Sequence, residues 1–195
     1  MSLQYNIQKY RNGSRDWYNK ILDNVYLGAI PLKTSSVNGN QGTLNEIPNR
    51  LATEFNVCAI ISCNEEFERC VTPSKDEWSK LGVELLKVNV ADFNFAPELA
   101  QLIEAANFID KYVQGKLFFV IYLLISVIIE NKGVYIHCKA GRTRSATVLG
   151  AYLIIHHSHS PTSAYDFMKK YRSHVILHDV HQTALQKLYA HVHAS

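Results

Sequence analysis

Residues 133–155 read GVYIHCKAGRTRSATVLGAYLII, and three kinds of local structure follow one another in them. Gly133 to His137 is a short run with β-branched and aromatic side chains, which is typical of a strand. Ala146 to Ile155 is almost wholly apolar, which indicates a buried helix. A polar loop with one glycine joins the two. The stretch therefore predicts a strand, a tight loop and a core helix.

Other segments repeat this alternation of strands and helices. The strands that we expect are Val25 to Ile30, Val57 to Ser62 and Glu84 to Val90. The helices that we expect begin near Pro48, Pro97 and Ser160 to Pro161, with a last helix over Val180 to Val192. Such alternation favours an α/β fold in which helices flank a central, mostly parallel sheet.

Composition is that of one ordinary globular domain. The chain has 195 residues, 47% of them hydrophobic and 19% charged, which is enough to bury a core without disulfides or a structural metal. A net charge of +3 is too small to indicate a nucleic-acid partner. The four cysteines, Cys58, Cys63, Cys70 and Cys138, form no C-x-x-C pair. We therefore expect no metal, no cofactor and a reducing compartment, and we interpret the nine histidines as surface residues.

The N-terminal segment, residues 1–14, is interpreted as a tail in front of a domain over residues 15–195. It carries Lys9 and Arg11, Arg15 follows, and no acidic residue precedes Asp16. This pattern is a weak signal of mitochondrial targeting, and it is also typical of a solvated tail.

One apolar segment does not fit the alternation. Leu117 to Ile129 reads LFFVIYLLISVII, and as a helix it would extend about 20 Å, less than the roughly 30 Å of a bilayer core. Three interpretations stay open: a buried strand or helix extension, an interfacial membrane anchor, or a translated intron. We treat residues 116–131 as an atypical insert and expect that the protein works without it.

The loop between strand and helix has the form H-C-x5-R-S, from His137 to Ser145. Five residues between a cysteine and an arginine can wrap so that their N–H groups point at one anion. Gly141 permits the tight curvature, and the following helix adds its positive end. The residues of this expected phosphate cradle are Lys139, Ala140, Gly141, Arg142, Thr143 and Arg144.

Each polar residue of this motif has a chemical role in such a cradle. The same donors lower a cysteine pKa, so Cys138 is the expected nucleophile. Arg144 offers a planar fork that holds two phosphoryl oxygens in the transition state. Ser145 would donate a hydrogen bond to the departing thiolate, and His137 would support the loop from the strand end.

A leaving alkoxide also needs a proton, and Asp92 is the candidate general acid because it lies on a loop between a strand and the Pro97 helix. Alone, Asp92 is better interpreted as a turn residue before a helix, and a lone Cys138 as a buried strand-end cysteine, which is common. The combined motif favours a phosphatase. A sulfurtransferase also uses a cysteine on a loop, but it needs neither the arginine nor the acid.

The motif HCKAGRTRSAT resembles the active loop of the dual-specificity phosphatases, in particular that of the mitochondrial phosphatidylglycerophosphate phosphatases within the protein-tyrosine-phosphatase superfamily. Further segments resemble the same family: RDWY at 15–18, LGAIPL at 27–32, NEEFE at 64–68, WSKLGVE at 78–84, and Asp92 with Pro97. The resemblance covers most of the chain from about Arg15 onward.

This resemblance implies a compact fold with the site at the carboxyl edge of the sheet, and conversion of phosphatidylglycerophosphate to phosphatidylglycerol on the route to cardiolipin. It also implies the matrix face of the mitochondrial inner membrane; a cytoplasmic location is the alternative. We expect a monomer whose partner is a phospholipid head group, a phosphoprotein being the second option, with a membrane surface nearby. Lys139 and Arg142 add two rim cations where a second phosphate could lie.

Two rival functions stay open. One is a phosphatase of phosphotyrosine or phosphothreonine proteins, and the other is a module that binds phosphate without turnover. The chain also departs from the family at the insert, in a longer segment between Lys33 and Pro48, and near His178 to His181, where the family's Arg-Pro-Gly-Gln is absent. Substrate positioning by the C-terminal part is therefore not carried over.

Overall fold

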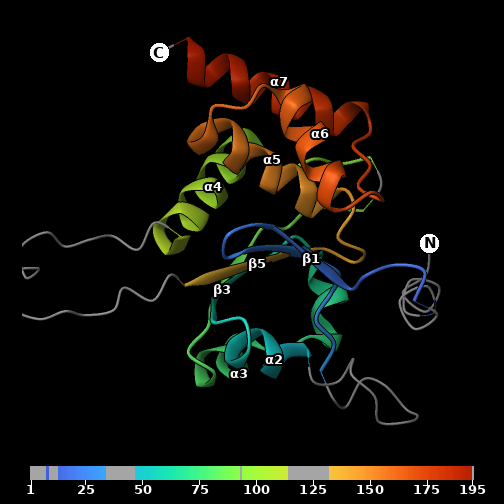
Figure 1. Ribbon diagram of the computed structural model, residues 1–195, viewed down its shortest axis with the longest axis vertical. Helices are drawn as coiled ribbons and strands as arrows, with labels where there is room; N and C mark the ends of the chain where they lie inside the picture. The colour runs from blue at the N-terminus through green and yellow to red at the C-terminus, as the bar shows by residue number, and fades with distance from the viewer. Residues whose placement is uncertain (1–7, 9–12, 34–46, 93, 114–131, 195) are drawn as a thin grey trace, which may run out of the picture.

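A five-stranded sheet in the order β1-β2-β5-β3-β4 forms the centre of the molecule (Figure 1). The computed structural model describes residues 8, 13–33, 47–92, 94–113 and 132–194. The strands are β1 (Tyr18–Leu22), β2 (Val25–Gly28), β3 (Val57–Ser62), β4 (Glu84–Lys87) and β5 (Gly133–His137). β1 pairs antiparallel with β2, and the other neighbouring pairs are parallel. The predicted α/β fold with a mostly parallel sheet is confirmed.

Helices cover both faces of the sheet. Those on one face are α4 (Leu99–Val113), α5 (Arg144–His157), α6 (Pro161–Tyr171) and α7 (Asp179–His193) (Figure 1). Those on the other are α2 (Ile47–Thr53) and α3 (Lys75–Lys80). A 3-10 helix, η2 (Glu66–Val71), follows β3.

Alternate residues of the central strands enter two separate cores. On β5, Val134 and Ile136 pack with α4 and α5, whereas Tyr135 packs in the cluster that includes Leu51 of α2 and Trp78 of α3. Successive side chains of a strand point to opposite faces, so a strand buried on both sides reads as a continuous apolar run. The apolar α5 is buried along most of its length, as its sequence predicts.

Several elements agree with the sequence and others do not. α6 begins where predicted, because the Ser160 side chain accepts from the Ser163 N–H and Pro161 occupies the first turn. β4 ends at Lys87 instead of Val90. β1, η2 and α3 were not predicted. β1 is a hairpin partner of β2, and Asn24 closes their turn at φ 61°.

The carboxyl ends of the parallel strands lie in one row across the sheet. Gly28 of β2 pairs with His137 of β5, His137 with Ser62 of β3, and Ser62 with Lys87 of β4. The chain leaves these strands at the same edge, so the segments that follow them meet there. This register positions the site.

The insert at 116–131 lies outside the described residues, as does most of the segment between Lys33 and Pro48 and most of the N-terminal tail. The proposed division at residues 14 and 15 therefore stays a prediction. In the described part of the chain, no helix has the length and apolar character needed to span a bilayer.

Candidate active site

The loop between β5 and α5 is closely wrapped against a neighbouring strand. Gly141 has φ 60°, and a Cβ built there would lie 2.3 Å from the carbonyl oxygen of Gly28. Any other residue would clash with this backbone and would adopt a strained left-handed conformation. Thr143 is the residue before α5, so the loop ends at the N-terminus of that helix. The predicted order of strand, tight loop and buried helix is present.

Arg172, just after α6, holds the outer side of this loop. Its Nε donates to the Gly141 carbonyl at 2.8 Å, and its Nη2 donates to the Ala140 carbonyl at 3.3 Å. The side chain is 1% exposed. Since these carbonyls point outward to Arg172, the loop presents its opposite side to a ligand. The sequence contains no local signal for this arginine, because the two partners are about thirty positions away.

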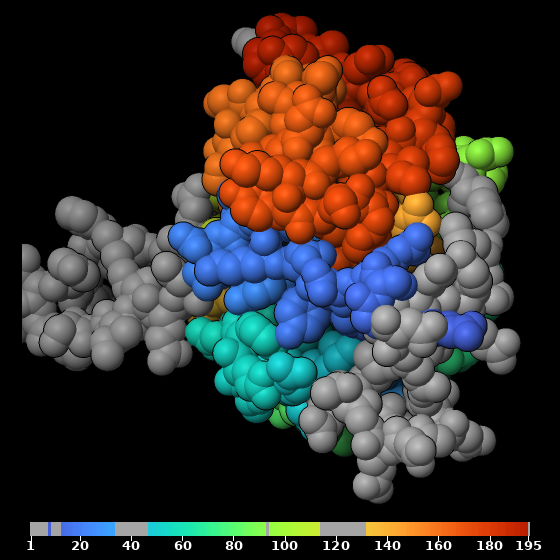
Figure 2. All heavy atoms as spheres, turned by 45° about the vertical axis from the view of Figure 1, so that its right-hand side comes forward, coloured from blue at the N-terminus to red at the C-terminus, as the bar shows by residue number. Residues whose placement is uncertain are grey.

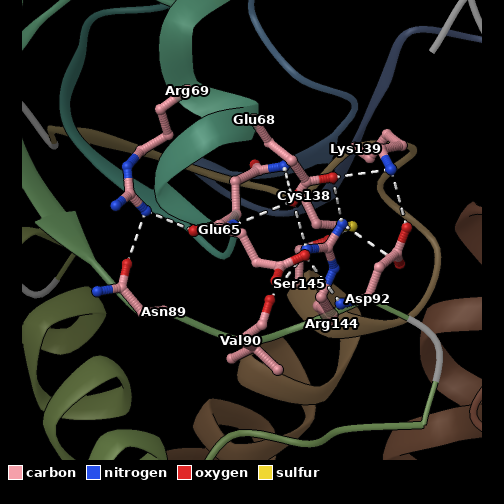
Figure 3. Close-up of polar contacts among 11 residues, drawn as sticks. Glu65, Glu68, Arg69, Asn89, Val90, Asp92, Cys138, Lys139, Arg144 and Ser145 are labelled. Carbon is pink, nitrogen blue, oxygen red and sulfur yellow. Dashed lines mark hydrogen bonds and ion pairs between the residues drawn. The ribbon is translucent and has the colours of Figure 1, made fainter.

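Cys138 lies at the base of the loop and is 4% exposed. The Ser145 hydroxyl donates to its sulfur at 3.2 Å (Figure 3). Burial raises the pKa of the Cys138 thiol, but the Arg144 charge and hydrogen bonds from Ser145 and from backbone N–H groups outweigh it and lower the pKa to about 7. A substantial fraction of this cysteine is therefore thiolate near neutral pH.

Arg144 is held by a buried carboxylate that the motif does not contain. Its Nη1 lies 2.7 Å from Oε2 of Glu68, and its Nη2 lies 3.2 Å from Oε1 (Figure 3). The Val90 carbonyl accepts a further hydrogen bond from Nη1 at 3.0 Å. Burial opposes ionisation of Glu68, but Arg144 and Lys139 lower its pKa to about 2. The guanidinium is thus fixed before any phosphate arrives.

Glu68 is positioned by η2, the short helix after β3. Its carboxylate also accepts hydrogen bonds from the Glu65 N–H at 3.0 Å and from the Asn64 side chain at 3.2 Å. Arg69 from the same turn donates to Asn89 at 2.7 Å and so joins η2 to the segment after β4. Glu68 is the last residue of the NEEFE segment at 64–68, for which the family resemblance gave no role. The sequence therefore did not reveal Glu68 as a site residue.

Asp92 meets the loop as predicted. Its carboxylate lies 3.0 Å from Lys139 Nζ and 3.3 Å from Arg144 Nη2, and its N–H donates to Glu65 at 3.4 Å (Figure 3). Its side chain is 28% exposed, which leaves one side open to a substrate. The structure therefore brings Asp92, from the segment after β4, together with Cys138 and Arg144 of the loop between β5 and α5.

The two predicted rim cations have different surroundings. Lys139 is 2.9 Å from Glu68 and 3.0 Å from Asp92, so it forms ion pairs with two carboxylates of the site. Arg142 points the other way, and its Nε donates to the His174 carbonyl at 3.0 Å.

His137 lies in the core at the end of β5. Its ring stacks on Tyr135 at 5.8 Å between centroids, and burial lowers the pKa of His137 to about 3, so the ring is neutral. The interpretation of the nine histidines as surface residues is wrong for His137 and for His181, which is fully buried at the start of α7. Single histidines carry no periodic signal that separates the two environments.

A family model described as "Dual specificity phosphatase, catalytic domain" matches residues 41–191 of this chain. The chain belongs to the dual-specificity phosphatases. The mouse protein named phosphatidylglycerophosphatase and protein-tyrosine phosphatase 1 is 35% identical over 181 residues, which cover 92% of this chain and 80% of the mouse protein.

Solved structures agree with this assignment. A crystal structure of PTPMT1 in complex with PI(5)P matches with a TM-score of 0.75 and 34% identity, over 92% of this phosphatase and 98% of that chain. Human DUSP28 matches with a TM-score of 0.64 and 20% identity, over 90% and 98%, which shows the shared fold alone. The phosphatase is a cysteine-dependent enzyme, and its site has a poised thiolate, a fixed guanidinium and a nearby carboxyl group.

Proposed function

We propose that this phosphatase removes the terminal phosphate of phosphatidylglycerophosphate through a phosphocysteine intermediate on Cys138. The observation that carries the proposal is the meeting of Cys138, Arg144 and Asp92 at the carboxyl edge of the sheet. The substrate is supported by similar proteins: one is named a phosphatidylglycerophosphatase, and one was crystallised with the phospholipid PI(5)P.

In the first step, the Cys138 thiolate attacks phosphorus and the bond to the glycerol oxygen breaks. Arg144 holds two equatorial oxygens as charge spreads over them, and the loop N–H groups surround the phosphoryl group. Asp92 gives its proton to the departing alkoxide, so that phosphatidylglycerol leaves as an alcohol. Glu68 keeps the guanidinium in place, which makes it a positioning residue.

In the second step, water hydrolyses the phosphocysteine. Asp92, now a carboxylate, accepts a proton from the water as its oxygen attacks phosphorus. The sulfur leaves as a thiolate and regains the hydrogen bond from Ser145, which lies 3.2 Å away in the resting enzyme. Phosphate is released, and Asp92 holds the proton for the next cycle.

A location follows from the same substrate. Phosphatidylglycerophosphate is a membrane lipid, so the phosphatase meets it at a bilayer surface, and we propose the matrix face of the mitochondrial inner membrane. A cytoplasmic location is the alternative. We also propose that the enzyme acts as a monomer.

The test is phosphate release from phosphatidylglycerophosphate in mixed micelles beside a phosphotyrosine peptide. We expect a higher kcat/KM on the lipid and no turnover by Cys138→Ser, because a hydroxyl is a much weaker nucleophile than a thiolate of lowered pKa. Cys70→Ser changes an exposed cysteine and serves as the matched control. A preference for the peptide would instead identify a protein phosphatase, and phosphate binding without any turnover would identify a binding module.

A further inference from the structure

Arg172 connects the active loop with the segment just before β1. Its Nη1 donates to the Asp16 carbonyl at 3.2 Å, and its Nη2 donates to the Trp17 carbonyl at 3.4 Å. The same guanidinium holds the Gly141 carbonyl at 2.8 Å. Figure 2 shows the N-terminal hairpin in blue, packed directly against the orange and red C-terminal helices. Arg172 therefore joins the backbone next to Arg15 to the loop, although the two are far apart in the sequence.

Two buried polar atoms lie in this corner without a hydrogen-bond partner. They are Nη1 of Arg15 and Nε2 of His174, and neither has a partner among the residues that the structure describes. Both side chains are only partly buried as a whole, so part of each faces outward. Buried polar atoms nearly always have partners, so each of these two atoms is expected to bind a water molecule or a polar group of a ligand.

The charges around these atoms define the ligand. The carbonyl of His174 accepts from Arg142 Nε at 3.0 Å, and burial together with the charges of Arg172, Arg15 and Arg142 lowers the pKa of His174 to about 3. The imidazole is thus neutral, and the charges of three arginines act on it. The nearest acid in sequence, Asp16, accepts a hydrogen bond from Asn19 at 3.0 Å. The corner is electropositive, in contrast to the Lys139 side, where Glu68 and Asp92 balance the cations.

We infer that Arg15, Arg142 and His174 form a second anion subsite, which binds the inner phosphodiester of the substrate while the terminal phosphomonoester lies on the loop. An arginine fork binds phosphate oxygens well, and a neutral imidazole can donate one further hydrogen bond. This inference rests on the proposed function, because phosphatidylglycerophosphate carries both groups. It explains how one loop distinguishes this lipid from substrates with a single phosphate.

The test measures binding alone, with the Cys138→Ser variant and two water-soluble ligands. Glycerophosphoglycerophosphate has both phosphates, whereas glycerol 3-phosphate has only the monoester. Calorimetry gives the affinity for each ligand. We expect glycerophosphoglycerophosphate to bind roughly tenfold more tightly than glycerol 3-phosphate, because its phosphodiester accepts additional charge-assisted hydrogen bonds. With Arg15→Gln added to Cys138→Ser, the ratio of the two affinities should fall to within about twofold. Arg15→Lys should keep part of the ratio, because it keeps the charge.

The matched control is Arg50→Gln in the same background, because Arg50 is an arginine on α2 that pairs with Glu54. It should leave the ratio of the two affinities as it was. Equal affinity for the two ligands before any change at Arg15 would overturn the inference, and so would a ratio that Arg15→Gln leaves intact. Thermal denaturation of each variant shows whether Arg15→Gln destabilises the fold. A purely structural effect would lower the affinity for both ligands equally, and this result would also overturn the inference. Neither ligand is turned over, so failure here is distinct from failure of the proposed lipid activity.

Discussion

At the scale of single residues, the nucleophile depends on a balance between burial and hydrogen bonding. Cys63 and Cys138 are both buried, yet burial, with the nearby Cys138, raises the pKa of Cys63, whereas Arg144 and Ser145 bring that of Cys138 to about 7. The difference is one of neighbours, since only Cys138 has a donor hydroxyl at 3.2 Å and the loop N–H groups. Two thiols in one core are therefore given opposite reactivity.

The pH dependence of Cys138 follows from this balance. A thiol titrates to the reactive thiolate as pH rises, so alkylation by iodoacetamide should reach half its maximal rate near pH 7. Ser145→Ala removes a hydrogen bond that favours the thiolate, so its midpoint should move to higher pH. The measurement is the rate of Cys138 labelling by mass spectrometry, with the exposed Ser79→Ala as control. A midpoint at 9.0 in the unchanged protein would contradict the lowered pKa.

At the scale of elements, the loop after β4 and η2 bring the acid and the arginine into register. β4 pairs with β3 so that Lys87 and Ser62 lie side by side, and the segments leaving both strands then run together. The Val90 carbonyl and Glu68 hold Arg144, while Glu65 accepts from the Asp92 N–H. Asp92 is thus tied to the same element that orients the arginine.

Asp92→Asn should separate substrates by their leaving groups. On an alkyl phosphate such as the lipid, turnover should fall by about a hundredfold to ten-thousandfold, the usual range for lost general acid catalysis. An aryl phosphate should lose less, because a phenolate leaves without full protonation. Parallel kcat measurements on both substrates check this, with the exposed Asp76→Asn of α3 as control. The same loss on both substrates would indicate that Asp92 has only a structural role.

At the scale of the whole molecule, Arg172 joins parts of the chain that no local element connects. It links the backbone at 16–17, before β1, to the backbone at 140–141, in the active loop. The contacts span 156 positions for Asp16 and 31 for Gly141. The active loop and the N-terminal hairpin therefore form one unit with the end of α6.

Arg172→Met should destabilise the fold through these contacts. It keeps an apolar side chain but leaves several buried carbonyl groups without donors, each costing about 1–3 kcal/mol, so we expect a loss of at least about 3 kcal/mol in the free energy of unfolding. Urea denaturation followed by circular dichroism gives the change. Arg50→Met, a surface replacement on α2, should stay within about 0.5 kcal/mol. A similar small change for Arg172→Met would mean that water replaces its contacts.

Deletion of Lys116 to Asn131 tests the insert, which lies outside the described residues. Exposed apolar surface costs about 25 cal/mol per Å² and promotes aggregation, so rejoining Gly115 to Lys132 should raise the soluble yield. Turnover should persist, because the contacts described for the site come from other segments. The yield and activity of the shortened chain are compared with those of the full chain. If the shortened chain unfolds while the full chain is soluble and active, the segment belongs to the core.

The sequence by itself determined the features that neighbouring residues encode. The order of strand, loop and helix from Gly133 to His157, the start of α6 and the identity of the cysteine and arginine all follow from consecutive side chains. Periodicity, capping and motif spacing act over a few positions, so they can be read from the chain directly. The position of Asp92 also followed, but only with the help of the motif downstream.

Only the tertiary structure decided which distant residues complete the site. Glu68 meets Arg144 across 76 positions, Arg172 meets Asp16 across 156, and His181 is buried although its sequence surroundings are polar. β1 joins the sheet because it pairs with the edge of β2. The short sequence of β1 does not predict this pairing. These contacts depend on strand order and register. Strand order and register are set by the packing of all the apolar faces together, and no local stretch of sequence contains that information.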